Sequence, residues 1–177
     1  MQNNLPDLWS NENLRNVMLK LPHKILHNRE VSGLAQIILH ELGPHLGFKR
    51  AMYLIDNPDF SCLKGVAGFC QNECKYHQQD LWQNPHAFGV DMEQAAFHDQ
   101  IQKFYHDNVV RKDGTCCPEA LAELGKKVGL TNPHVFTWPM RHDNTGILLY
   151  DPEEAGVCKN HPEVLDHASA LLGLCSV

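Results

Sequence analysis

The sequence predicts an α+β fold in which helices pack on the faces of an antiparallel sheet. Residues 134–151 contain two β-rich runs on either side of a polar turn, a pattern that favours a hairpin. Residues 30–43 place apolar side chains at the spacing of an amphipathic helix. The complete order of predicted elements is helix, strand, strand, long loop, helix, short strand, helix, strand, strand and helix. This order is typical of an α+β domain.

The composition of the chain argues against several classes of function. The chain has 177 residues, enough for one domain with a sizeable core, and a formal net charge of −6. It has no basic cluster, which argues against nucleic acid or an anionic membrane as a partner. No apolar run approaches the length of a membrane span, and the N-terminus lacks the features of a signal peptide. We therefore expect a cytoplasmic protein whose seven cysteines are mostly reduced thiols.

We expect an N-terminal helical segment over residues 1–28, ahead of the main domain over residues 29–177. Ser10 is suited to cap the first helix, and Pro22 is expected to end or kink it. The apolar face of this helix consists of Leu14, Val17, Met18 and Leu21.

The main domain is predicted to begin with a helix from about Glu30 that stops at Gly43-Pro44. Two strands follow, over residues 48–55 and 62–69, joined by a turn at residues 57–59. Gly65 and Gly68 indicate a bulge in the second strand, or the close approach of another backbone or a ligand. The apolar stripe of the helix consists of Val31, Leu34, Ala35, Ile38 and Leu42.

The middle of the chain is predicted to be less regular. Residues 70–91 form a long polar loop, and a loop of this length in a compact domain is usually functional or mobile. A helix over residues 93–105 is expected next, followed by a short strand at Val109-Val110 and a turn at Asp113-Gly114. A further helix begins at Pro118, which suits a first helical position, and ends at Gly129.

The hairpin and a closing helix complete the predicted domain. Neither run of the hairpin has a clean polar face, so we expect both faces of this part of the sheet to be covered. Pro139 has no backbone donor, so its position should face a sheet edge or a bulge. The last helix is predicted from Pro162 to Leu174.

With these elements in order, the chain resembles a GAF domain, the small-molecule sensor module of many signalling proteins, over about Glu30 to Leu174. The resemblance rests on the helix-to-strand run LGPHLGFKRAMYLID, on Trp138-Pro139-Met140 followed by residues 144–148, and on the closing amphipathic helix. More narrowly, the hairpin is similar to that of the GAF-like module found beside HDOD domains in bacterial signalling proteins.

The resemblance implies a regulatory domain rather than an enzyme. It implies a GAF-like antiparallel sheet with the terminal helices on one face and a helix–loop layer on the other, with a small ligand between the sheet and that layer. It also implies a homodimer through the terminal helices and a signalling output domain. The family's cyclic-nucleotide motif is not present. The aromatic residues that we expect at a ligand site are Phe69, Trp82, Phe88, Phe136 and Trp138, although core packing also explains Phe136 and Trp138.

A metal- or redox-responsive sensor on the same fold is an alternative. Cys70, Cys74 and His77 have spacings that suit zinc or iron, and one cysteine of the Cys116-Cys117 pair, Cys117, is the expected fourth ligand. Unrelated buried thiols and exposed imidazoles explain the same residues. We interpret His40 as a solvated residue on the polar side of its helix.

A thiol enzyme is a further alternative, because one branch of the GAF fold reduces free methionine sulfoxide with cysteines. Cys116 and Cys117 directly precede the helix at Pro118, and a helix N-terminus lowers the pKa of a thiol. The cysteine spacing of that branch is not matched. We therefore expect no catalytic residues and a protein that is not an enzyme.

Overall fold

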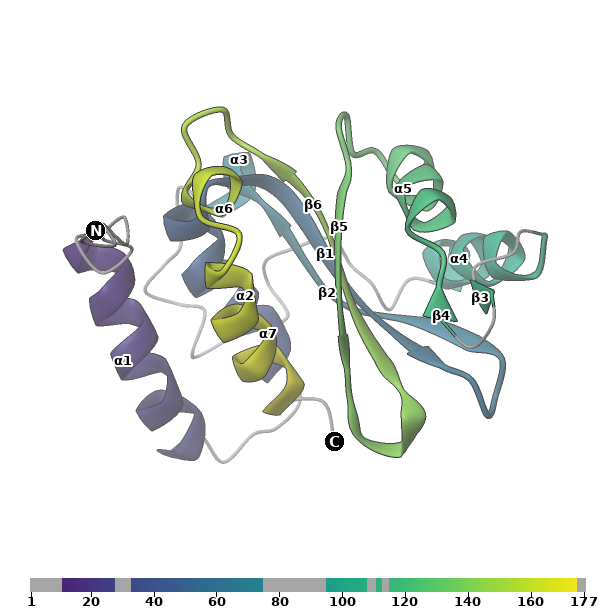
Figure 1. Cartoon of the computed structure of the whole chain (residues 1–177), viewed down its shortest axis with the longest axis horizontal. Coiled ribbons are helices and arrows are strands. Elements are labelled where there is room, and N and C mark those ends of the chain that lie inside the picture. The colour runs from purple at the N-terminus through teal and green to yellow at the C-terminus, as the bar shows by residue number, and fades with distance from the viewer. Residues whose placement is uncertain (1–10, 28–32, 75–94, 108–110, 113–114, 175–177) are drawn as a thin grey trace, which may run out of the picture.

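The computed structural model describes residues 11–27, 33–74, 95–107, 111–112 and 115–174. Figure 1 shows how its elements are arranged. The elements are α1 (Glu12–His27), α2 (Leu34–Leu46), β1 (Phe48–Asn57), β2 (Cys62–Cys70), α3 (Gln71–Cys74), α4 (Ala95–Asp107), β3 (Arg111–Lys112), β4 (Thr115–Cys116), α5 (Pro118–Lys127), β5 (His134–Pro139), β6 (Thr145–Pro152), α6 (Val157–Asn160) and α7 (Val164–Leu174).

The described residues form a four-stranded antiparallel sheet in the order β2-β1-β6-β5, which confirms the predicted α+β class. The predicted hairpin is present as β5 and β6, but β5 lies at an edge of this sheet. Pro139 therefore stands on an edge strand, as expected. The prediction that both hairpin strands are covered on both faces is wrong for β5, because His134 and Thr137 are exposed. It holds for β6, which is buried along most of its length.

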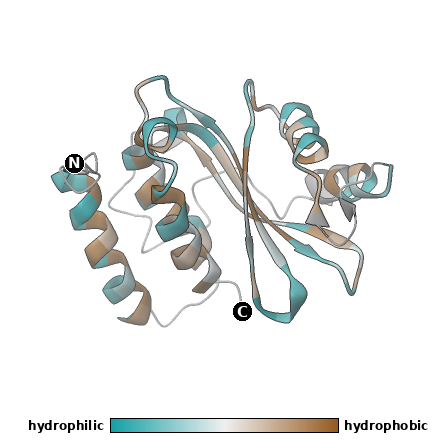
Figure 2. Ribbon diagram, viewed as in Figure 1, coloured by the Kyte–Doolittle hydropathy of each residue, from teal (hydrophilic) through white to brown (hydrophobic). Residues whose placement is uncertain are grey.

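Helices cover both faces of the sheet (Figure 1). On one face α2 and α7 pack against the strands, and α1 packs outside α2. On the other face α4 and α5 enclose a second group of buried side chains. Successive residues of β1 alternate between the two groups, so that Tyr53 belongs to the first and Leu54 to the second. Figure 2 shows that the central strands are largely hydrophobic, whereas the turn between β5 and β6 is hydrophilic.

The strand pair β1–β2 contains the predicted bulge. Its register shifts between Tyr53 and Leu54, whose partners are Ala67 and Gly65. Val66 is therefore the extra residue of the bulged strand. The turn before β2 also forms as predicted, because the side chain of Asn57 accepts hydrogen bonds from the two backbone N–H groups that follow Pro58.

The end of α2 differs from the prediction. The helix continues through Gly43 and Pro44 to Leu46 and is capped by Gly47 at φ 74°. Gly43 is required by packing rather than by the helix end, because an added Cβ would lie 2.7 Å from the ring of Phe69. Pro44 is tolerated because it stands in the last turn, where the loss of one helical hydrogen bond is least costly.

α1 also passes through its proline, so Pro22 does not end it. The observed cap is Asn11, whose side chain accepts a hydrogen bond from the backbone of Leu14 at 3.1 Å. The predicted apolar face is confirmed for Leu14, Met18 and Leu21. These three side chains join the same core group as α2 and α7, so α1 packs as part of the domain.

Several predicted features of the middle of the chain lie outside the described residues. These are most of the long loop, the short strand at Val109-Val110 and the turn at Asp113-Gly114. The helices that flank the predicted short strand and turn are confirmed as α4 and α5, and Pro118 is the first residue of α5. Ile101 and Phe104 are buried on α4.

A buried carboxylate fixes the connection between α5 and β5. Asp151, 4% exposed, accepts a hydrogen bond from the backbone N–H of Thr131 at 2.7 Å and another from that of Asn132 at 2.8 Å. Each carboxylate oxygen has one of these donors, so the side chain binds the loop in a single geometry.

Two glutamines hold the outer edge of β2. Gln36 of α2 donates to the carbonyl of Gly68 and accepts from its N–H at 2.9 Å. Gln102 of α4 does the same at Leu63, where the N–H lies 3.4 Å from the amide oxygen. Each side-chain amide thus takes the place of a neighbouring strand.

His40 is buried, 1% exposed, which corrects its interpretation as a solvated residue. Its Nε2 lies 3.0 Å from the carbonyl oxygen of Gly68, and its ring makes an edge contact with Phe69. Burial lowers the pKa of His40, and the hydrogen bond to Gly68 offsets this in part. The folded protein therefore holds a neutral imidazole at this position.

The lowered pKa of His40 predicts a loss of stability in mild acid. An unfolded histidine has a pKa of 6.5, whereas the folded protein disfavours protonation of His40. The contribution of His40 to the free energy of unfolding is therefore complete above pH 6.5 and decreases as the pH falls below it. Between pH 7.5 and pH 5 the free energy of unfolding should drop by up to about 2 kcal/mol through this residue. Urea titrations of the wild type and of His40→Gln at pH 7.5 and at pH 5 measure this change in the free energy of unfolding.

The His40→Gln protein is the control, because glutamine keeps a donor and does not titrate. His45 also has a pKa lowered by burial, with Glu41 opposing the shift, and contributes equally to both proteins. An identical pH dependence in the two proteins would contradict the assignment of the effect to His40.

Candidate functional site

A cavity of about 530 Å³ lies between the β5–β6 hairpin and the C-terminal half of α7. Figure 1 shows this end of α7 beside the hairpin turn. The hairpin contributes residues 138–142 and Asn144, and α7 contributes Ser169, Ala170, Gly173 and Leu174. The volume is in the range of pockets that hold small organic molecules.

The turn of the β5–β6 hairpin, which lines the cavity, contains two residues with a left-handed backbone conformation. Met140 donates its N–H to the carbonyl of Asn144 at 2.9 Å, which closes the turn. Within it His142 and Asp143 both have φ of 57°, a left-handed conformation that costs most non-glycine residues about 1–2 kcal/mol each. Arg141 and His142 of this turn line the cavity.

Trp138 forms the inner wall of the cavity. One face of its indole stacks on Tyr53, with ring centres 5.4 Å apart, and the Tyr53 hydroxyl donates to the sulfur of Met140 at 3.6 Å. Gly146 makes room for the indole, because an added Cβ would lie 2.2 Å from the ring. These contacts fix the orientation of the indole before any ligand binds.

Two buried polar atoms at the cavity have no hydrogen-bond partner among the described residues. They are Nε1 of Trp138 and the side-chain oxygen of Asn144. Trp138 is paired with Gly146, so Asn144 is its diagonal neighbour on the same face of the hairpin, with Cα atoms about 7–8 Å apart. A buried donor or acceptor without a partner costs about 1–3 kcal/mol. Both atoms are covered by neighbouring protein atoms, so a ligand in the cavity does not reach them in this conformation.

The entrance of the cavity is basic. Arg141 and His142 are exposed and line it, and none of the described lining residues carries a carboxylate. Within the part of the chain that the structure describes, the guanidinium of Arg141 has no ion pair or hydrogen bond. This is unusual for a chain with net charge −6, in which carboxylates outnumber basic side chains.

The predicted ligand residues are only partly brought together. Trp138 lines the cavity, and Phe136 lies behind it with ring centres 6.0 Å apart. Phe69 is fully buried under α2, against Gly43 and His40. Trp82 and Phe88 lie outside the described residues. The cavity is on the face covered by the terminal helices, whereas the resemblance implied a ligand on the opposite face.

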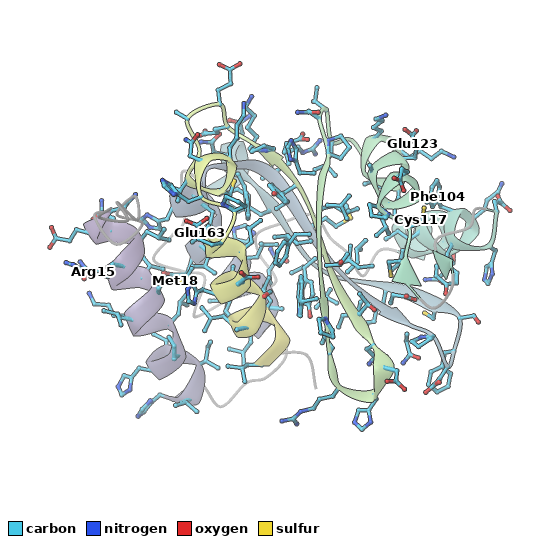
Figure 3. All side chains as sticks on the ribbon, viewed as in Figure 1. Arg15, Met18, Phe104, Cys117, Glu123 and Glu163 are labelled. Carbon is cyan, nitrogen blue, oxygen red and sulfur yellow. The ribbon has the colours of Figure 1, made fainter. Side chains whose placement is uncertain are left out.

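The structure does not bring the predicted metal ligands Cys70 and Cys117 together. Cys70 is paired with Arg50 at one end of β1, and the sulfur of Cys116 lies 3.2 Å from an oxygen of Asp56 near the other end. Six residues of strand separate these points, about 20 Å. Figure 3 shows Cys117 on the side of the sheet that carries α4 and α5.

The side chain of Cys74 and the whole of His77 lie outside the described residues. Among the described residues no cluster of three or more histidine, cysteine or acidic side chains is arranged to hold a metal ion. The thiol of Cys117, at the N-cap of α5 as predicted, donates to the carboxylate of Glu119 at 3.2 Å. Burial raises the pKa of Cys158 to about 11, which keeps that thiol protonated.

Trp138 is the one described cavity residue that the sequence predicted, and those it missed include Arg141, His142, Asn144 and Gly173. The first three were interpreted as turn residues. A glycine within the apolar pattern of the last helix is a sign of close approach, and Gly173 faces Trp138, with an added Cβ 3.5 Å from Nε1. The partners of these residues are distant in sequence, so no local pattern shows that they meet.

Comparison of the chain with protein-family models, with curated proteins and with solved structures finds no match. In the described part of the chain, no helix combines the length and the apolar character that crossing a membrane requires.

Proposed function

We propose that this chain is a non-catalytic sensory domain of GAF-like architecture that binds a small organic molecule between the β5–β6 hairpin and α7. The observation that carries the proposal is the cavity itself, which has a volume of about 530 Å³ and is lined by Trp138 of the hairpin and by Gly173 and Leu174 of α7. The lining supplies groups that bind and orient a ligand, and its described residues include neither a thiol nor a carboxylate.

The position of the cavity suits signalling through the terminal helices. Its outer wall is α7, α7 packs on α2, and α2 packs on α1. A ligand that changes the position of α7 therefore acts on the whole helical layer. On α1, Leu19 and Leu26 are 68% and 82% exposed and seven residues apart, the repeat of a helix-to-helix seam. This supports the proposal of a homodimer through α1.

Gly173→Ala is the variant that tests the binding site. The new methyl group would stand in ordinary contact with Nε1 of Trp138, so it should block the ligand without a clash. In a thermal-shift screen of metabolites, a ligand at one hundred times its Kd should raise the melting temperature of the wild type by about 5–10 °C. The same compound should leave the melting temperature of the Gly173→Ala protein unchanged.

Alanine is a better helix former than glycine, so the variant should itself melt no lower than the wild type. A screen in which no compound distinguishes the two proteins would refute a ligand site at this cavity.

A further inference from the structure

We propose that the ligand of this cavity is a small amphiphilic organic anion, with an apolar body and a carboxylate or similar acidic group bound by Arg141. This inference rests on the proposed function and specifies its chemistry. Two features of the site determine the class of ligand: the exposed cation that lines the cavity and the apolar surface of the other lining residues.

Arg141 supplies the charge preference. Its guanidinium stands at the entrance, without a described partner, and no described acidic side chain lines the cavity to compete for it. A guanidinium binds a carboxylate through two parallel N–H···O hydrogen bonds, which a neutral amide cannot match. His142 lines the same side and adds a further hydrogen-bonding group.

The remaining wall is apolar. Met140, Ala170 and Leu174 contribute hydrocarbon or thioether surface, and Leu174 is 65% exposed. Burying this surface favours a ligand with a hydrophobic body and disfavours a fully hydrophilic ion such as inorganic phosphate. An organic acid with an aromatic or aliphatic chain satisfies both features.

The test compares matched acids and amides. Binding of phenylacetate, octanoate, phenylacetamide and octanamide to the full chain is measured by calorimetry, and the Trp138 indole N–H resonance is followed by NMR after assignment with Trp138→Phe. We expect the acids to bind at least tenfold more tightly than the amides and to shift the indole resonance. Raising the salt concentration should weaken the acids selectively.

Two arginine variants show where the charge preference originates. Arg141→Gln should lose roughly tenfold or more in affinity for the acids and change little for the amides, and Arg141→Lys should keep part of the preference. Arg15→Gln is the matched control, because Arg15 lies on the outer helix α1, far from the cavity (Figure 3).

Equal binding of acids and amides, or an acid preference that survives Arg141→Gln, would overturn the inference and leave the ligand site standing. Failure of both acids to bind at millimolar concentration would also overturn it, because the class of ligand would be wrong. The metabolite screen against Gly173→Ala tests the proposed function separately, since it makes no assumption about charge.

Discussion

Replacing Asp151 with alanine should lower the free energy of unfolding by about 3–5 kcal/mol. The carboxylate is buried and accepts backbone hydrogen bonds at 2.7 and 2.8 Å from Thr131 and Asn132. Its removal leaves two donors without a partner, and hydrogen bonds to a charged group contribute more than neutral ones. Chemical denaturation monitored by circular dichroism measures the loss as a lower midpoint.

Asp151→Asn separates the charge from the shape of the side chain. The amide keeps one acceptor and sets an NH₂ group against the other donor, so we expect a loss nearly as large as that of the alanine variant. Glu154→Ala is the control, because Glu154 is an exposed acidic residue just beyond the same strand. If the denaturation midpoints of Asp151→Ala and Glu154→Ala agree within experimental error, the loop does not depend on the carboxylate of Asp151.

Gly146→Ala should destabilise the protein by about 2–3 kcal/mol and also abolish ligand binding. The added Cβ would lie 2.2 Å from the indole of Trp138, and this ring also stacks on Tyr53, so it cannot move without breaking that stack. Thermal unfolding and the indole resonance of Trp138 give the two readouts.

Gly173→Ala adds the same methyl group near the same indole, and its expected effect on stability has the opposite sign. There the nearest atom is 3.5 Å away and the residue is helical, so stability should rise by up to about 1 kcal/mol. A Gly146→Ala protein as stable as the wild type would mean that Trp138 is free to leave its position.

The parts of the fold that the sequence predicted well are those with local signals. The β5–β6 hairpin, the start of α5 at Pro118 and the apolar face of α7 each follow from periodicity or turn chemistry within a few residues. The end of α2 was wrong because Gly43 and Pro44 were interpreted as a helix stop. The structure uses Gly43 to admit the ring of Phe69, a residue on β2 that no local pattern connects to it.

His40 was misplaced for a related reason. An amphipathic pattern assigns one face of a helix to water, but α2 is enclosed by the sheet, α1 and α7. The unbroken apolar run Ile37-Ile38-Leu39 was the available sign of a helix buried on several sides. At the candidate site, Trp138 was predicted from its type and position. Asn144 and Gly173 were not, because they join Trp138 at one cavity only when the hairpin and α7 pack together.

The two glutamines at the outer edge of β2 have a consequence for assembly of the fold. Gln36 comes from one helical layer and Gln102 from the other, so the edge is closed only when helices have docked on both sides of the sheet. Until then, β2 offers bare peptide groups to any other extended chain. The time between sheet formation and helix docking is therefore the interval in which newly made copies are most prone to stick to one another.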